Sequence, residues 1–152
     1  MKFNAIFLPI LLNKLRKRVD ISCRDLLTKY NLSQIHLLYL MALYEYSEGL
    51  TLRELTELLG FDKANTTRAV SQLIKKGYAE KQTQGELEHK FKVTLNASGK
   101  LAASEIYDHN QSQNLDIIKL LTTEEMLVLG RVAEKLWVFL SDEPVTESKG
   151  VI

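Results

Sequence analysis

Apolar residues recur at three- and four-residue steps along most of this chain, which is the spacing of one face of an α-helix. A first helix is predicted from about residue 4 to about residue 30, with Pro9 tolerated only where the helix starts or kinks. Its apolar stripe consists of Leu8, Leu11, Leu12, Leu15, Val19, Cys23, Leu26, Leu27 and Tyr30. A second helix, capped by Ser33 and ending near Tyr46, is apolar on nearly all sides, so we expect it to be central and buried.

Two short helices joined by a tight corner are predicted next. Thr51 and Glu54 have the spacing of a capping box, which begins the third helix. Gly60 is expected to end it in the left-handed conformation that glycine tolerates. Asp62 can cap the fourth helix, and Gly77 can end it. This arrangement is typical of a helix-turn-helix, whose second helix can lie in the major groove of DNA.

Two short β-like runs, 78–83 and 91–95, flank a polar loop and predict a hairpin wing. The second run alternates, so we expect its apolar residues inward and its polar residues, Lys92 and Thr94, outward. A fifth helix is predicted from Asn96 to about residue 121. A second capping box, Thr122 with Glu125, opens a sixth helix that ends near residue 141.

The first, fifth and sixth helices lie outside the helix-turn-helix, and each is predicted to carry a long apolar stripe. A small domain does not need this much additional apolar surface for its own core. We therefore expect these helices to interlock with a second copy of the chain around a two-fold axis.

With 152 residues, of which 45% are hydrophobic and 26% charged, the chain is expected to form one globular domain. The predicted fold class is mainly α with a small β-hairpin wing. A winged helix-turn-helix at about 33–96 is joined to dimerisation helices at about 4–30 and 97–141. No apolar run reaches the roughly 18 residues that span a membrane. A single cysteine excludes an internal disulfide, and we expect a cytoplasmic location.

Positive charge gathers on the predicted winged segment. Residues 51–100 contain nine basic and six acidic side chains, a net charge of +3, although the whole chain carries only +1. Such a distribution suits a polyanionic partner, because neutralisation of phosphates drives non-specific DNA affinity. The excess is modest and supports DNA binding only together with the helix-turn-helix pattern.

Nearly the whole chain resembles the MarR family of winged-helix transcriptional regulators. The motifs are Thr51-Leu-Arg-Glu-Leu55, Thr67-Arg68, Leu73-Ile-Lys-Lys-Gly-Tyr78 and Val93-Thr-Leu-Asn-Ala-Ser-Gly99. The resemblance implies a homodimer that binds a pseudo-palindromic DNA operator, most often as a repressor. It also implies release of the DNA when a small phenolic or other effector binds. The family's wing carries an Asp-x-Arg element, and Glu88-His89-Lys90 stands in its place here.

The outward face of the fourth helix and its surroundings are the predicted DNA contacts. Small polar side chains allow the helix to sit deep in the groove, where Asn can pair with adenine, Arg with guanine and Thr with phosphate or thymine methyl groups. The alternative is an ordinary solvated helix face. The predicted set is Thr51, Arg53, Lys63, Ala64, Asn65, Thr66, Thr67, Arg68, Ser71, Lys75, His89 and Lys90.

An effector pocket is predicted around Tyr30, His36 and Tyr39, although such tyrosines are more often core residues with hydrogen-bonded hydroxyls. Cys23 lies on the apolar stripe, away from the position of the cysteine in the peroxide-sensing branch of the family, and a buried inert thiol is favoured. A zinc-responsive branch has a histidine where His36 stands. It also needs a histidine pair in the fifth helix, where this chain has His109 with Gln113, a poor zinc site. We expect no metal or other cofactor.

No phosphate-binding glycine loop, nucleophile elbow or cysteine with a suitable base is visible in the sequence, so we expect no enzymatic activity. The predicted function is therefore that of a dimeric, sequence-specific DNA-binding regulator. The alternatives are a winged-helix protein-interaction module that does not bind DNA and a metal-responsive regulator.

Overall fold

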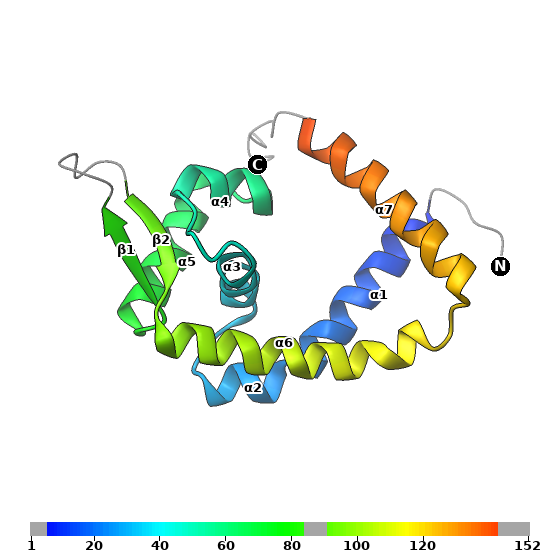
Figure 1. Cartoon of the computed structure of the whole chain (residues 1–152), viewed down its shortest axis with the longest axis horizontal. Helices are drawn as coiled ribbons and strands as arrows, with labels where there is room; N and C mark the ends of the chain where they lie inside the picture. The colour runs from blue at the N-terminus through cyan, green and yellow to red at the C-terminus, as the bar shows by residue number, and fades with distance from the viewer. Residues whose placement is uncertain (1–5, 84–90, 143–152) are drawn as a thin grey trace, which may run out of the picture.

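The computed structural model describes residues 6–83 and 91–142. Seven helices and a two-stranded hairpin are described in these ranges, in the mainly helical winged arrangement expected from the sequence (Figure 1). In chain order they are α1 (Phe7–Ser22), α2 (Arg24–Lys29), α3 (Gln34–Glu45), α4 (Leu52–Leu59), α5 (Lys63–Lys75), β1 (Ala79–Thr83), β2 (Phe91–Leu95), α6 (Ala97–Ile118) and α7 (Thr123–Asp142). None of the described helices has the length and apolar character needed to cross a membrane.

The single first helix expected from the sequence is in fact two helices, α1 and α2, which meet at Cys23. The Cys23 side chain is fully buried, and its thiol donates a hydrogen bond to Oδ1 of Asn110 in α6, 2.9 Å away. Leu27 is buried in the core, whereas α1 has no buried residue among those described. The break at Cys23 therefore lets α2 pack with the winged helix while α1 extends away from it.

Predicted helix ends are confirmed around the helix-turn-helix. The Thr51 hydroxyl accepts from the Glu54 backbone N–H at 3.2 Å, and the Glu54 carboxylate accepts from the Thr51 backbone N–H at 2.7 Å. The Asp62 carboxylate accepts from the backbone N–H of Asn65 at 2.7 Å and so caps α5. Gly60 ends α4 with φ 68°, a left-handed conformation that favours glycine.

The hairpin pairs β1 with β2 in antiparallel register, with Ala79 opposite Leu95. Thr94 does not point outward as expected from the alternation, because it is buried with 4% of its surface exposed. Gly49 passes directly over it: a Cβ on Gly49 would lie 2.6 Å from the Thr94 methyl carbon. The cause is the loop before α4, which adds an isolated bridge between Leu50 and Val93 and covers this edge of the hairpin.

Helix α3 lies at the centre of the winged helix, as predicted, and contacts α4, α5, α6 and β2. Its buried side chains include Leu37, Leu40 and Leu43. Each fully buried leucine of this kind contributes about 1.5–3 kcal/mol relative to an exposed one. The core therefore holds α5 against α3 and fixes the direction in which the outer face of α5 points.

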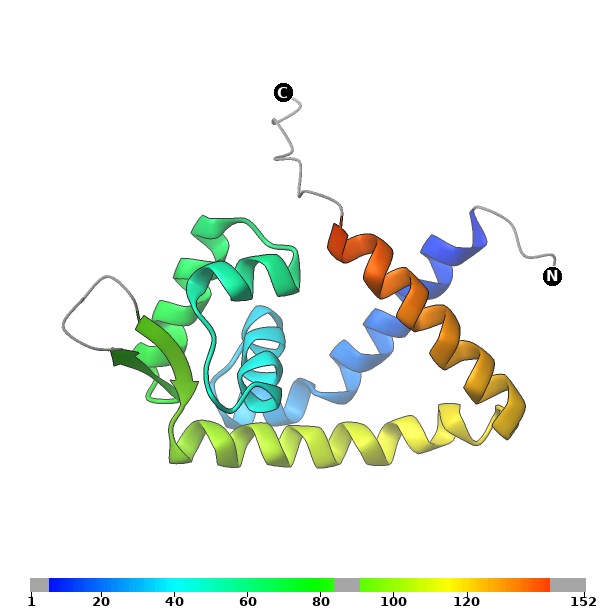
Figure 2. The same ribbon diagram turned by 45° about the horizontal axis from the view of Figure 1, so that its top comes forward.

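Helix α6 runs along the base of the molecule, and α7 turns back from its far end (Figures 1 and 2). The predicted capping box begins α7, because the Thr122 hydroxyl accepts from the Glu125 backbone N–H and the Glu125 carboxylate accepts from the Thr122 backbone N–H. Helices α1 and α7 both leave their apolar side chains exposed. Those on α1 are Leu8, Ile10, Leu11, Leu12, Leu15, Val19 and Ile21, and those on α7 are Leu127, Val128, Leu129, Val132, Leu136, Trp137, Val138, Phe139 and Leu140.

Candidate nucleic-acid interface

The outer side of α5 carries most of the predicted DNA-contacting residues, and we call it the recognition face. Its members have exposed side chains on one side of an amphipathic helix. The other side carries the buried side chains Ala69, Val70 and Leu73. The recognition face consists of Lys63, Ala64, Asn65, Thr67, Arg68, Ser71 and Lys75. Its charged side chains are basic, and its remaining side chains are short, so the backbone of α5 can approach a partner closely.

Thr66 was predicted to lie on this outward face, and the structure shows that this placement is wrong. Its side chain is completely buried. The Thr66 hydroxyl lies 3.1 Å from the Tyr39 hydroxyl of α3 and 3.0 Å from the Thr56 hydroxyl of α4. The physical reason is the helical period, because Thr66 precedes the buried Ala69 and Val70 by three and four positions. Thr66 therefore joins three helices from inside.

The first turn of α5 holds its polar groups in a local network. The Asn65 amide nitrogen donates to the Asp62 carboxylate at 2.5 Å, in addition to the backbone bond that caps the helix. The backbone N–H of Asn65 lowers the pKa of Asp62, because it stabilises the ionised carboxylate. The Asn65 side chain is exposed, and its bond to Asp62 fixes its direction. Asn65 must give up this bond before its amide can pair with a base.

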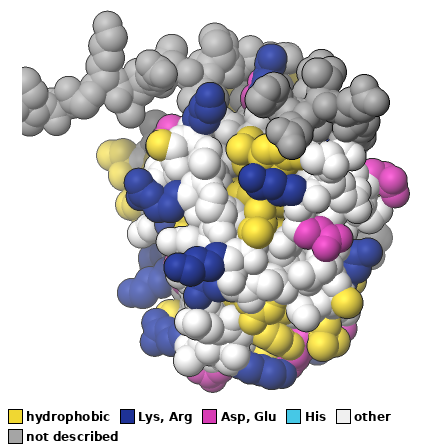
Figure 3. Space-filling model, turned by 90° about the vertical axis from the view of Figure 1, so that its left-hand side faces the viewer, with side chains coloured by type: hydrophobic (Ala, Val, Ile, Leu, Met, Phe, Trp, Pro, Cys, Tyr) yellow, Lys and Arg dark blue, Asp and Glu magenta, His cyan; other side chains and the backbone are white. Residues whose placement is uncertain are grey.

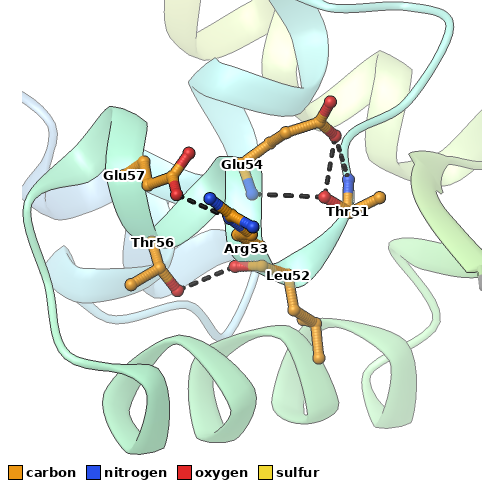
Figure 4. A network of polar contacts seen from close by, with 6 residues as sticks. All are labelled: Thr51, Leu52, Arg53, Glu54, Thr56 and Glu57. Carbon is orange, nitrogen blue, oxygen red and sulfur yellow. Dashed lines mark hydrogen bonds and ion pairs between the residues drawn. The ribbon is translucent and has the colours of Figure 1, made fainter.

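The start of α4 contributes two further predicted contacts, Thr51 at its N-cap and Arg53 (Figure 4). Thr51 is occupied by the capping box with Glu54. The Arg53 guanidinium forms an exposed ion pair with Glu57, one turn later, at 2.7 Å. An ion pair as exposed as this one contributes little to stability, because solvent and salt screen the two charges. The Arg53 guanidinium can therefore exchange Glu57 for a DNA phosphate at a small cost in free energy.

The wing side of the molecule presents α5, β1 and β2, and Lys and Arg side chains gather along one edge of it (Figure 3). The exposed basic residues of these elements are Lys63, Arg68, Lys75 and Lys81. His89 and Lys90, the predicted wing contacts, lie outside the described residues. Three of these four basic side chains, Lys63, Arg68 and Lys75, belong to the recognition face.

Two of the three predicted effector residues, Tyr30 and His36, line one pocket, and the third does not. The pocket has a volume of about 650 Å³ and is bounded by Tyr30, Asn31, His36, Gln72, Lys75, Lys76 and Tyr78. Tyr39 instead lies in the core, with its hydroxyl bonded to Thr66 and its ring stacked on Phe61 at 5.9 Å between centroids. Its burial raises the pKa of the Tyr39 hydroxyl and keeps it neutral.

His36 links α3 to α5, the recognition helix. Its Nδ1 accepts from the backbone N–H of Ser33 at 3.0 Å, so Nε2 carries the proton and donates to Oε1 of Gln72 at 2.7 Å. Burial lowers the pKa of His36, which favours this neutral form. The sequence analysis did not identify Gln72 as a partner of His36. The available signal was its helical spacing, which places Gln72 on the same side of α5 as Ala69 and Lys76.

Tyr30 connects this region to α6. Its hydroxyl donates to the Glu105 carboxylate, which also accepts from Lys29 at 2.6 Å, and its backbone carbonyl accepts from the Tyr78 hydroxyl at 2.8 Å. Lys29 and Tyr30 together lower the pKa of Glu105. Asn31 follows with φ 52°, and its carbonyl accepts from Lys76 at 2.6 Å. The end of α2 is thereby tied to both the recognition helix and α6.

The residues weighed for sensing roles are engaged with the protein. Burial raises the pKa of the Cys23 thiol, which favours the unreactive protonated form. His109 lies beside the backbone carbonyl of Ser22, with Nε2 at 2.9 Å from the oxygen. Among the described side chains, no group of three or more His, Cys, Asp or Glu residues could hold a metal ion.

Comparison with known proteins gives a consistent picture. A family model described as MarR family matches residues 30–86, while no curated protein matches the chain. The structure of NadR in complex with 4-hydroxyphenylacetate is similar, with 20% identity, a TM-score of 0.74, and coverage of 90% of this chain and 95% of that one. A MarR family regulator from Listeria monocytogenes complexed with a 26mer DNA has 21% identity, a TM-score of 0.78, and coverage of 93% and 91%. The reduced form of MarR from E. coli has 19% identity, a TM-score of 0.67, and coverage of 90% and 98%.

Proposed function

We propose that the chain, of which residues 30–86 match a MarR family model, is a DNA-binding transcriptional regulator of that family and acts as a repressor, as a homodimer on a pseudo-palindromic operator. The observation that carries the proposal is the recognition face, where short polar and basic side chains are exposed on a helix that the core holds rigidly. Arg68 is the side chain best suited to a guanine, and Asn65 to an adenine.

A salt titration with the DNA upstream of the protein's own gene tests this proposal. Phosphate contacts require the affinity to fall log-linearly and steeply with salt concentration. Replacing Arg68 by Ala should weaken binding to the preferred sequence by about 1–3 kcal/mol if it reads a base pair. The matched control is Lys119→Ala, which removes an exposed cation at the far end of α6. Absence of any shift with this DNA would instead favour a protein-interaction module.

The homodimer is supported by the exposed apolar faces of α1 and α7. A stable interface of this kind should bury on the order of 2,000 Å² or more in total. The two recognition helices should then lie roughly 34 Å apart, one turn of DNA. Light scattering at micromolar concentration should report twice the mass of one chain, and a single-chain mass would contradict the proposal.

Release by a small phenolic or aromatic effector completes the proposed cycle. Support comes from the similar structure of NadR, which holds 4-hydroxyphenylacetate, and from the pocket that Tyr30 and His36 line. An effector can act only if it binds the DNA-competent and DNA-incompetent arrangements with different affinity. A coupling of about 1–3 kcal/mol would lower DNA affinity by roughly 5- to 150-fold.

A further inference from the structure

We propose that Glu105 is a positioning residue for DNA binding: it fixes the direction of α6 relative to the recognition helix and thereby restricts the operator to one spacing of its two half-sites. The inference rests on the proposed function, a homodimer whose two recognition helices bind one operator. Glu105 lies on α6 and accepts hydrogen bonds from Lys29 and Tyr30 at the end of α2. We call these three residues the α2–α6 link.

The Glu105 carboxylate joins two helices that are far apart in the sequence. Nζ of Lys29 lies 2.6 Å from one carboxylate oxygen and 2.8 Å from the other, and the Tyr30 hydroxyl donates to the second oxygen as well. Donors from two neighbouring residues fix the carboxylate in direction as well as in distance. Among the residues that the structure describes, this is the one ion pair that joins two different helices.

The end of α2 is also bonded to the end of the recognition helix. The Tyr78 hydroxyl donates to the Tyr30 carbonyl at 2.8 Å, and Nζ of Lys76 donates to the Asn31 carbonyl at 2.6 Å. The side chains of Lys29 and Tyr30 thus bind α6, while the backbone carbonyls of Tyr30 and Asn31 bind the residues that follow α5. The α2–α6 link therefore connects α6 to the recognition helix by two short steps.

Polar contacts hold α6 to the winged helix at two points. The first is the start of α6, where a Cβ on Gly99 would lie 1.9 Å from the Tyr78 carbonyl oxygen. Glu105 is the second, about 9 Å farther along the helix. The apolar contacts between these points, made by Ala102 and Ala103, are non-directional. The hydrogen bonds of Glu105 therefore add the constraint that fixes the angle of α6.

A small tilt of α6 would change the spacing of the two recognition helices. From Gly99 to Ile118, α6 extends about 28 Å, and a tilt of about 10° moves its far end by roughly 5 Å. This end leads to α7, which with α1 carries the apolar faces of the proposed dimer (Figure 2). One base pair changes the separation of two half-sites by about 3.4 Å and their relative rotation by about 35°. The angle of α6 therefore distinguishes operators that differ by one base pair in spacing.

The α2–α6 link can be removed without unfolding the protein. The side chains of Lys29 and Glu105 are 56% and 39% exposed, so their ion pair contributes little to stability. Glu105→Ala should leave the Tm nearly unchanged while it frees α6 to tilt. The matched control is Asp108→Ala, which removes an exposed carboxylate from the same helix.

The first measurement is the distance between α5 and α6 within one chain, by pulsed electron–electron double resonance without DNA. Spin labels are attached at Ser71→Cys and Ser112→Cys in a Cys23→Ser background, which keeps a donor for Asn110. Labelled chains are diluted with unlabelled chains, so that distances between copies do not contribute. The measurement therefore reports the angle of α6 whether the protein is a monomer or a dimer.

We expect Glu105→Ala to widen this distance distribution by about 3 Å, which corresponds to a tilt of about 10° at a position about 20 Å along α6 from Gly99. Asp108→Ala should leave the distribution unchanged. The exchange Lys29→Glu, Glu105→Lys restores an ion pair and should restore the narrow distribution.

The second measurement uses an operator that the wild-type protein selects from random-sequence DNA, with versions that carry one base pair more or fewer between the half-sites. We expect the wild-type protein to lose about 10-fold in affinity on either change, comparable to one mismatched base pair, and Glu105→Ala to lose only about 3-fold. A variant that is simply less stable would bind all three operators more weakly in the same proportion. The ratio of affinities therefore separates positioning from stability.

The inference is wrong if Glu105→Ala keeps the wild-type distance distribution, or if its affinity ratios for the three operators equal those of the wild type. Failure of the proposed function gives a different result. A wild-type protein that selects no DNA sequence, with a wider distribution in Glu105→Ala, would refute the regulator and keep Glu105 as the residue that holds α6. Sequence-specific DNA binding with unchanged ratios would keep the regulator and refute the role of Glu105.

Discussion

Thr66 illustrates how a single side chain can set the direction of a recognition helix. It lies within α5, is completely buried, and hydrogen-bonds to hydroxyls of α3 and α4. The Thr56 hydroxyl in turn donates to the Leu52 carbonyl at 2.7 Å. These bonds run across the interior of the helix-turn-helix, where water cannot replace them. Thr66 therefore positions the recognition face without belonging to it.

Replacing Thr66 by Val should destabilise the protein by about 1–3 kcal/mol, because the isosteric methyl group leaves the buried Tyr39 hydroxyl without its partner. Urea denaturation followed by circular dichroism measures the change. Thr66→Ser retains the hydroxyl and should lose less. Thr67→Val, at an exposed position one residue later, is the control. Equal effects of Val at 66 and 67 would contradict the positioning role.

His36 predicts a pH dependence of stability. Burial lowers the pKa of His36 in the folded protein below its ordinary 6.5. The unfolded chain therefore binds a proton first as pH falls, and the free energy of unfolding should decrease with falling pH below 6.5, until the folded-state pKa is passed. Urea titrations between pH 7.5 and 5 measure the slope. The variant His36→Gln should flatten it, and an unchanged slope would show that other groups cause it.

The placement of Thr66 could have been read from the sequence, since it precedes Ala69, Val70 and Leu73 by three, four and seven positions. Its polarity suggested the outer face instead. The burial of Tyr39 follows equally from the all-apolar pattern of α3. Helical spacing places Gln72 on the side of Ala69 and Lys76, but its contact with His36 could not be predicted, because the two residues are 36 positions apart and the contact depends on how α3 crosses α5.

At the scale of elements, the start of α6 depends on a close approach of two backbones. A Cβ added to Gly99 would lie 1.9 Å from the carbonyl oxygen of Tyr78. The approach is fixed by Asn96, whose amide donates to the Gly77 carbonyl at 2.9 Å and whose carbonyl oxygen caps Gly99. The recognition helix, the hairpin and α6 are therefore joined within one small corner.

Gly99→Ala should push α6 away from this corner and reduce stability by about 1–3 kcal/mol through overpacking. Thermal unfolding measures the loss as a lower Tm. Ser98→Ala, at the exposed neighbouring position of the same turn, provides the control and should leave Tm nearly unchanged. If Gly99→Ala and the control have the same Tm, the backbone at Tyr78 can move to accept the added methyl group, and the predicted overpacking is wrong.

Element boundaries were predictable wherever a cap marks them. Thr51, Asp62 and Thr122 begin helices as expected, because their side chains replace hydrogen bonds that the first turn lacks. The break at Cys23 was not predictable, since apolar spacing continues through it from Val19 to Leu27. The contacts made at the break join residues 87 positions apart, the Cys23 thiol with Asn110 and the Ser22 carbonyl with His109, so they could not be read from local spacing.

At the scale of the whole molecule, the apolar faces of α1 and α7 predict the effect of added charge. The double variant Leu129→Lys, Leu136→Lys places two cations, two helical turns apart, on one stripe of α7. We expect a monomer by light scattering and weaker DNA binding, because only one recognition helix engages at a time. Glu134→Lys, an exposed change on the same helix, should remain dimeric. A dimeric double variant would place the interface elsewhere.

The fold class was predictable because helix caps, the glycine corner and the alternating hairpin all agree on one architecture. The exposed apolar faces of α1 and α7 were likewise predictable from the apolar stripes of the first and last helices. The geometry of the proposed dimer is not predictable in this way, since an apolar stripe fixes which side is covered but not the angle at which a second copy crosses it.

The exposed apolar faces of α1 and α7 also have a consequence for the lifetime of the protein. In the proposed homodimer, α1 and α7 bury their apolar faces only through association, so the Tm should rise with protein concentration. At low abundance more chains would be single, and single chains with exposed apolar helices open more readily to proteases. The cellular amount of such a protein would therefore help determine how long each copy survives.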